Sequence, residues 1–211
     1  MRKFVPAYEG NLRKHALSVP RCISECSGIR VFGRRIKSLV FSTDVAIIKN
    51  INADAIIAVY PFTPQPAITQ AIIGVSEVPV FCGVGGGLTN GVRSASMAAY
   101  VEHQGAYGVV CNSKIGVETI HAIKDAVEIP VVYTVISENT DIQPYLTAGV
   151  DIINVSGAAR TPEIVGALRQ RYPELPIIAT GGPTEESILA TIRAGANAIT
   201  YTPPSSASLF A

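Results

Sequence analysis

The sequence lacks tryptophan, and among its 211 residues only three are histidines, four are cysteines and 16% are charged. No apolar run approaches the roughly 18 residues of a membrane-spanning helix. The N-terminus "MRKFVPAYEG" has no apolar core of the kind found in a signal peptide. These absences argue against a membrane protein and a secreted one. We therefore expect a cytoplasmic protein whose cysteines stay reduced.

Several kinds of active site also lack their residues. His15 lies in the N-terminal arm, and His103 and His121 fall in predicted helices, which argues against a histidine-based triad or zinc site. The cysteine spacing matches no strong zinc pattern, and no close pair of carboxylates follows neighbouring predicted strands. The loop "GVGGGLTNG" is not followed by the GK[ST] of a P-loop. We expect neither a metal nor a cofactor.

What the sequence does have is apolar residues in short, regularly spaced runs. Apolar residues make up 48% of the chain and the mean hydropathy is +0.33, as strands buried on both faces would produce. Helix-like stretches such as "GVRSASMAAYVEHQG" separate the runs, and this alternation favours a parallel sheet. The runs span residues 38–42, 55–61, 78–83, 108–113, 130–136, 151–157, 176–182 and 197–203.

A two-unit repeat points to closure of that sheet. Even-numbered runs begin with small-residue turns ("NADAII", "GAYGVV", "GVDIIN", "GANAIT"), whereas "VPVF", "IPVV" and "LPII" begin with proline. A βαβα unit repeated to eight strands predicts a single α/β domain, a (β/α)8 TIM-type barrel; an open doubly wound sheet is the alternative. Only "PSSASLFA" follows the eighth run, so the closing helix is missing, or is replaced by the N-terminal arm or a partner subunit.

The positive charge is concentrated in residues 1–37. This segment holds nine of the 17 Lys and Arg and two of the 16 Asp and Glu, so its net charge is +7 and that of residues 38–211 is −6. We divide the chain into a basic arm (1–37) and a barrel (38–211). The arm packs on its own barrel or on another subunit, or contacts nucleic acid.

Catalytic residues of such barrels lie at the C-terminal ends of the strands. Our candidates there are Lys114, Asp44 and Glu138. Lys114 opens a helix, where a cation opposes the helix dipole, and it either meets an anionic ligand or reaches solvent. Asp44 moves a proton or caps a helix, and Glu138 is placed for acid–base work.

Other polar residues at these ends are candidates for binding substrate. Asn112 lies near the end of the fourth run, Asn154 lies on the sixth run, and Arg160 follows the sixth. Cys82 and Cys111 are small buried side chains or thiol nucleophiles. The loop "GVGGGLTNG" is a lid over a ligand or a flexible connection.

The segment from Pro176 to Thr202, with "PIIATGG" and "AGANAI", resembles the end of phosphate-binding TIM barrels. Thiamine-phosphate synthase and the 2-keto-3-deoxy-6-phosphogluconate aldolases end in this way. The "RIKSLVF", "IIATGG" and "SLF" segments also resemble glycerol-3-phosphate-responsive antiterminator proteins.

This resemblance implies that Gly181 and Gly182 donate backbone N–H groups to a phosphate, completed by the loop after the eighth strand. That loop contains two prolines, which have no N–H, so the hydroxyls of Thr202 and Ser205 would take part. The Schiff-base lysine of the aldolases is not carried over, because Asn154 stands on the sixth strand.

Two functions follow from these patterns. The first is an enzyme that acts on a small anionic metabolite, phosphorylated or carboxylated, with lyase, aldolase or isomerase chemistry at the C-terminal face of the barrel. The alternative is a non-catalytic metabolite-binding regulator, similar to an antiterminator, whose basic arm contacts RNA or a partner. We expect a homo-oligomer with no membrane contact.

Overall fold

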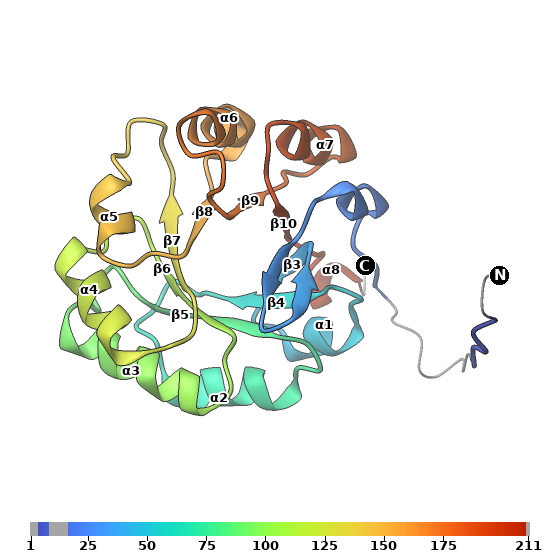
Figure 1. The fold of residues 1–211 in the computed structure, drawn as a ribbon. Helices are drawn as coiled ribbons and strands as arrows, with labels where there is room; N and C mark the ends of the chain where they lie inside the picture. Colours follow the sequence, from blue (N-terminus) through green and yellow to red (C-terminus); the bar gives the residue numbers. More distant parts are fainter. Residues whose placement is uncertain (1–3, 9–16, 210–211) are drawn as a thin grey trace.

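The computed structural model describes residues 4–8 and 17–209. Its centre is a closed barrel of eight parallel strands in the order β10-β3-β4-β5-β6-β7-β8-β9 (Figure 1). The predicted (β/α)8 barrel is confirmed, and an open sheet is excluded. The strands are β3 (Ser38–Phe41), β4 (Ala55–Ala58), β5 (Val80–Gly85), β6 (Gly108–Cys111), β7 (Val131–Val135), β8 (Ile152–Val155), β9 (Ile177–Thr180) and β10 (Ala198–Tyr201).

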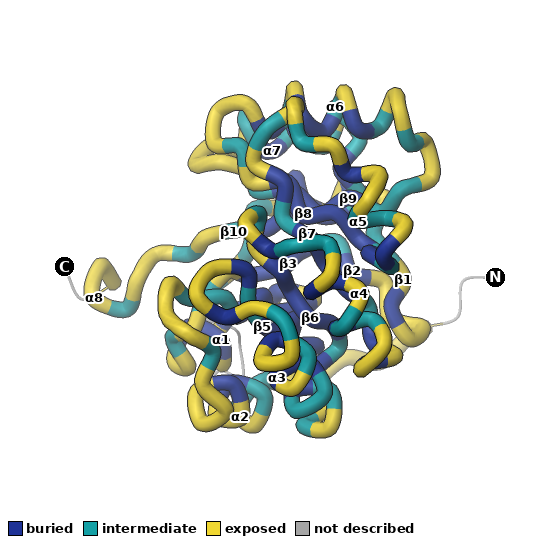
Figure 2. Tube along the Cα trace, turned by 90° about the vertical axis from the view of Figure 1, so that its left-hand side faces the viewer, coloured by how far each residue is buried: buried dark blue, intermediate teal, exposed yellow. Residues whose placement is uncertain are grey.

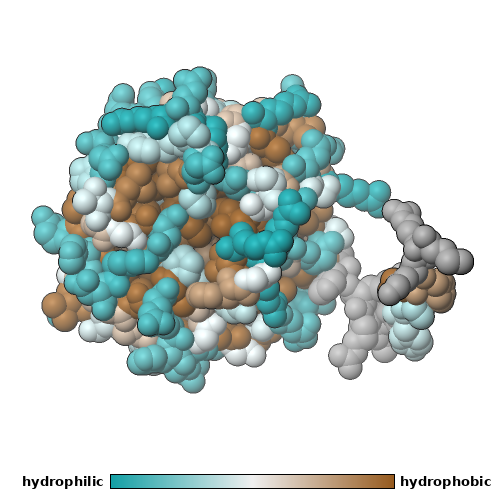
Figure 3. All heavy atoms as spheres, viewed as in Figure 1, coloured by the Kyte–Doolittle hydropathy of each residue, from teal (hydrophilic) through white to brown (hydrophobic). Residues whose placement is uncertain are grey.

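Helices surround the barrel, and α1, α2, α3, α4, α6 and α7 each have residues buried against it. In Figure 2 the strands are dark blue and the outward turns of the helices are yellow. The view in Figure 3 shows hydrophilic residues around the rim of the molecule, with apolar residues between them. Within residues 4–8 and 17–209, no helix has the length and apolar character needed to cross a membrane. The helices are α1 (Val45–Asn50), α2 (Pro66–Val75), α3 (Val92–His103), α4 (Val117–Ala126), α5 (Gln143–Thr147), α6 (Thr161–Arg171), α7 (Glu185–Arg193) and α8 (Ser206–Leu209), with 3-10 turns η2 (Arg21–Glu25) and η3 (Ala158–Arg160).

The N-terminal segment occupies the place of a full eighth helix. Among the described residues after β10, the chain forms only the four-residue α8. Turn η2 instead contacts α7, and its residues Cys22 and Ile23 are buried in the main apolar core together with Cys26, which follows the turn. Leu17 pairs with Ile51 just beyond α1, so residues 17–26 bridge the gap between α7 and α1. The rest of the basic arm at 1–3 and 9–16, and the "SLF" ending beyond Leu209, lie outside the described residues.

A hairpin that the sequence analysis did not predict fills one end of the barrel. Strands β1 (Ile29–Val31) and β2 (Arg34–Ile36) pair with each other, and Phe32 and Gly33 between them have φ of 45° and 81°. Two residues with positive φ form the kind of two-residue turn that matches strand twist. Val31 and Ile36 join the apolar cluster of the barrel interior. The hairpin therefore covers the apolar interior at the end where the strands begin.

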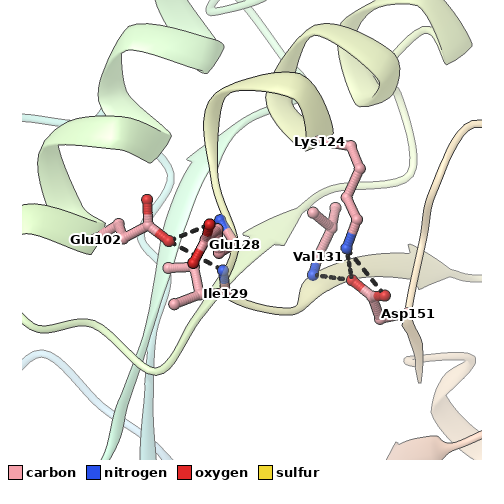
Figure 4. A network of polar contacts seen from close by, with 6 residues as sticks. All are labelled: Glu102, Lys124, Glu128, Ile129, Val131 and Asp151. Atoms are coloured by element: carbon pink, nitrogen blue, oxygen red, sulfur yellow. Dashed lines mark hydrogen bonds and ion pairs between the residues drawn. The ribbon is translucent and has the colours of Figure 1, made fainter.

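Polar side chains at this same end explain the two-unit repeat. Asp54, Asp151 and Asn197 each stand one residue before an even-numbered barrel strand and accept backbone N–H groups at the start of the strand before it. Figure 4 shows Asp151, whose Oδ2 lies 2.8 Å from both the Val131 N and the Lys124 Nζ. Such contacts at the N-terminal end of a barrel stabilise the fold rather than act on substrate.

Candidate functional site

The inward-facing positions of the strands change from apolar to polar toward their C-terminal ends. Three apolar interior residues are each followed, two positions later, by a polar residue on the same side of the strand, as the period of two requires. The pairs are Val132 and Thr134, Ile152 and Asn154, and Ala198 and Thr200.

Above this layer lies a cavity of about 650 Å³, here called the mouth cavity. That volume is within the usual range for small-molecule sites. Its apolar wall is formed by Phe41, Ile57, Val59, Phe62, Leu88 and Val110, among others. Its polar lining consists of Tyr60, Thr63, Gln65, Thr89, Asn112, Thr134, Asn154, Ser156 and Thr200.

Two residues that line the mouth cavity each have a buried polar atom without a partner among the described residues. Asn154 is 8% exposed and Thr200 is 5% exposed. The Asn154 Nδ2 donates to the Thr134 Oγ1 at 3.2 Å. The Asn154 Oδ1 and the Thr200 Oγ1 have no hydrogen-bond partner among the described residues. Buried polar atoms are rarely left unpaired in proteins, where the partner is another protein group, an ordered water or a ligand. This pair therefore makes the polar end of the cavity a candidate place for a ligand.

Tyr60 lies two residues after the end of β4, directly before the segment "PFTPQP". Its hydroxyl accepts a hydrogen bond from the Gln65 N–H at 2.8 Å. That bond orients the hydroxyl and leaves its own proton for another acceptor. Of the described residues that line the cavity, Tyr60 alone has a titratable side chain.

The glycine-rich loop after β5 is packed at its base against Asn112. The Asn112 N–H donates to the Gly85 carbonyl at 3.1 Å, and a Cβ on Gly86 would lie 2.3 Å from the Asn112 Oδ1. Gly86 also has φ of +108°, so a side chain is excluded there by space and by backbone. Leu88 at the tip is 98% exposed. The base of the loop thus has a packing role, while a lid function of the tip stays a prediction.

The structure places the three predicted catalytic residues outside the cavity lining. Lys114 is exposed in the middle of the loop from β6 to α4. Asp44 is the N-cap of α1 and accepts hydrogen bonds from the N–H groups of Ala46 and Ile47 and from the Ser206 hydroxyl. The Ser206 hydrogen bond in particular lowers the pKa of Asp44. The capping alternative for Asp44 is therefore confirmed.

Glu138 and Arg160 form an ion pair with each other, and Arg160 also contacts Glu163. A hydrogen bond to its own backbone, together with the Arg160 guanidinium, lowers the pKa of Glu138. The Glu138 carboxylate raises the pKa of Arg160. The positive charge of Arg160 is thus met by this chain's own carboxylates.

The predicted phosphate-binding residues divide between packing and surface positions. The Gly181 N–H donates to the Thr200 carbonyl at 3.1 Å, and a Cβ on Gly181 would lie 2.7 Å from the Ile188 Cγ1. Gly182 has φ of +78°, a left-handed conformation that favours glycine. Thr202 and Ser205 are exposed. Of all the predicted binding residues, only Asn112 and Asn154 line the mouth cavity.

The helix that follows the two glycines has a capped N-terminus. Thr184 is the N-cap of α7 and forms a capping box with Ser187, and Glu185 and Glu186 lie in the first turn.

The cysteines on the barrel strands are buried and inert. Cys82 and Cys111 are both 0% exposed, within the core between strands and helices. Burial raises the pKa of each thiol to about 12. A thiolate nucleophile at neutral pH is therefore not available from either residue.

Comparison with known proteins identifies the fold of the chain but does not assign it to a family. No family model and no curated protein sequence matches the chain. Among solved structures, the chain is similar to 2,3-dimethylmalate lyase, a PEP mutase/isocitrate lyase superfamily member, with a TM-score of 0.63, 14% identity and coverage of 86% of this chain and 78% of that one. It is also similar to phosphonopyruvate hydrolase in complex with oxalate and Mg²⁺ (TM-score 0.62, 16% identity, coverage 80% and 76%). A third is phosphoenolpyruvate phosphomutase from Streptomyces platensis subsp. rosaceus (TM-score 0.62, 16% identity, coverage 78% and 75%). Identity at this level carries the barrel fold alone.

One of these structures contains Mg²⁺, a cation whose ligand requirements can be compared with the residues of the mouth cavity. The described lining residues include no carboxylate, imidazole or thiol. Across the described part of the chain, no group of three or more His, Cys, Asp or Glu could hold a metal ion. Mg²⁺ needs hard oxygen ligands and is usually held through carboxylates, so these residues do not fit such an ion.

Thr200, Thr134 and Tyr60 line the cavity although they were not among the predicted site residues. The period of two along each strand, counted from the apolar interior residues, is the signal that finds Thr134 and Thr200. For Tyr60 the sequence gives only its place at a strand end.

Proposed function

We propose that the protein is an enzyme that acts on a small metabolite bound in the mouth cavity, with lyase- or isomerase-type chemistry. The observation that supports this most is the pair of unpartnered buried atoms, Asn154 Oδ1 and Thr200 Oγ1, on a cavity of about 650 Å³. The cavity lies at the C-terminal ends of the strands, where enzymes of this fold have their active sites.

Tyr60 is the residue that we propose to move the proton in such a reaction. Its hydroxyl is fixed by the Gln65 N–H at 2.8 Å and lines the cavity. Tyrosine is among the side chains that serve as general acids or bases. Lys114, Asp44 and Glu138 would need a different arrangement of their loops to reach a ligand in the cavity.

The negative charge that the sequence leads us to expect of the substrate stays a prediction. Neither Lys114 nor Arg160 is among the lining residues. A phosphate or carboxylate in the cavity would be hydrogen-bonded by neutral hydroxyl and amide groups. Proteins similar in fold include a lyase, a hydrolase and a mutase, which is compatible with lyase or isomerase chemistry but selects no substrate.

The experiment is a panel of sugar phosphates, small keto and hydroxy acids and their uncharged amide and alcohol analogues. Each compound is tested for a rise in melting temperature and then for turnover by proton NMR. We expect at least one compound both to stabilise the protein and to be converted. Tyr60→Phe should retain the binding and lose the conversion. If no compound stabilises the protein, the proposed site is wrong.

One observation favours a second function, a metabolite-binding regulator. A cavity in which Tyr60 is the only titratable group among the described lining residues suits binding better than many acid–base reactions. In that case a compound stabilises the protein without being converted. An RNA contact through the arm remains part of this proposal, although Arg35 and Lys37 each donate to a backbone carbonyl of this chain.

A further inference from the structure

The charge around the mouth cavity limits what it can hold. The described lining residues include no Asp, Glu, Lys, Arg or His. Arg160, the cation predicted to bind an anion, is paired with Glu138 and Glu163 outside the cavity. Burying an ionised group without a partner of opposite charge is costly, so the lining favours an uncharged ligand over a phosphate.

Asn154 and Thr200, which form the polar floor of the cavity, favour a ligand head group that both donates and accepts hydrogen bonds. The Asn154 Nδ2 donates a hydrogen bond to the Thr134 hydroxyl. The Asn154 Oδ1 and the Thr200 Oγ1 have no hydrogen-bond partner among the described residues. An amide presents a donor on one side and an acceptor on the other, and a hydroxyl is both. A carboxamide or a hydroxy-carbonyl group offers the matching pair without a charge.

The walls suit an apolar body above that head group. Phe41, Phe62 and Leu88 are aromatic or aliphatic side chains that line the cavity while remaining 41%, 72% and 98% exposed. Exposed apolar groups that gather around a cavity mark a place where apolar ligand surface is covered. Ile57 and Val110 continue the apolar surface down to the polar floor.

We propose that the mouth cavity takes a small, uncharged, amphipathic molecule, with a neutral hydrogen-bonding head on Asn154 and Thr200 and an apolar or aromatic body along the Phe41, Phe62 and Leu88 wall. This inference rests on the proposed function only in taking the mouth cavity as the binding site. It narrows the substrate class from any small metabolite to an uncharged one.

The test uses three probes that share a phenyl ring and differ in the head: benzamide, benzoate and phenylphosphonate. Their affinities are measured by NMR titration of the full chain. We expect benzamide to bind at least about tenfold more tightly than either anion. Thr200→Val should weaken benzamide binding several-fold, whereas Thr191→Val, at a buried threonine of α7 that does not line the cavity, should leave it unchanged.

Two results overturn the inference, and they differ in what they say of the site. If benzoate or phenylphosphonate binds as tightly as benzamide and Thr200→Val weakens that binding, the site stands and the uncharged ligand class is wrong. If none of the three probes shifts the resonances of cavity residues, the ligand class is wrong and the mouth cavity loses its support as the site.

Discussion

Replacing Thr200 by valine should stabilise the ligand-free protein. The Thr200 side chain is buried, at 5% exposed, and its hydroxyl has no partner in the described structure. A buried hydroxyl without a hydrogen bond costs about 1–3 kcal/mol. Valine has nearly the same shape and suits a strand equally well. We expect the free energy of unfolding to rise by about 1–2 kcal/mol, since part of the cost is relieved by local adjustment.

The matched control is the same substitution at Thr191. This residue is 1% exposed, but its hydroxyl donates to the Ser187 carbonyl at 2.9 Å. Loss of a satisfied hydrogen bond typically costs about 1 kcal/mol, so Thr191→Val should lower the stability. Both substitutions replace threonine by valine, but the resulting changes in the free energy of unfolding should have opposite signs.

Urea denaturation followed by circular dichroism measures both changes, and thermal melts give a second value. For a chain of this length, 1 kcal/mol corresponds to a shift in melting temperature of about 2–4 °C. If Thr200→Val destabilises the protein as much as Thr191→Val does, the Thr200 hydroxyl is a satisfied structural group. In that case the Thr200 hydroxyl is not a group that awaits a ligand.

Three further predictions concern residues around the site. Gly181→Ala should lower the free energy of unfolding by about 1–3 kcal/mol, because the added Cβ would lie 2.7 Å from a neighbouring isoleucine; an unchanged urea midpoint would show that the paired glycines are not needed for packing. Cys82 and Cys111 should resist iodoacetamide in the folded protein at pH 8, because burial raises the pKa of each to about 12; peptide mapping measures this, and rapid labelling of either would show an accessible thiolate. The pKa of Asp44 is lowered, so the stability it contributes is complete above the ordinary aspartate pKa of about 4 and is lost as the pH falls through the lower folded pKa. Ser206→Ala should raise that pKa in an NMR titration, and a value equal to that of the unaltered protein would contradict the assigned hydrogen bond.

The barrel strands could be predicted from the sequence because each is a buried, apolar run with a turn signal before it. The structure also explains three of the turn residues. The side chains of Asp54, Asp151 and Asn197 accept backbone N–H groups at the start of the neighbouring strand. The β1–β2 hairpin could not be predicted in the same way. Its segment "IRVFGRRI" is short and basic, and only two of its side chains, Val31 and Ile36, are buried.

The candidate site was predictable in its position and only partly in its residues. The rule of C-terminal strand ends finds Asn112 and Asn154, which line the cavity. The same rule also selects Glu138 and Arg160, which do not line the cavity. These two residues are 22 positions apart in the sequence and form an ion pair with each other. The difference between the two pairs depends on how the loops fold back, which no local pattern contains.

The paired glycines show a second limit of local patterns. A "TGG" sequence after a strand is the same whether its amides bind phosphate or the glycines serve close packing. The Gly181 N–H donates a hydrogen bond to the Thr200 carbonyl, and a Cβ on Gly181 would lie too close to Ile188. Both features depend on residues that are distant in the sequence or on another element. Only the three-dimensional structure shows them.

The most direct test of the mouth cavity as the functional site is a crystal structure with the compound that most raises the melting temperature. We predict that the compound occupies the mouth cavity, with polar atoms within hydrogen-bond distance of the Asn154 side chain and the Thr200 hydroxyl. Density for the compound on Gly181, Gly182 and the loop after β10, with the cavity free of it, would contradict this account and support the phosphate-type site instead.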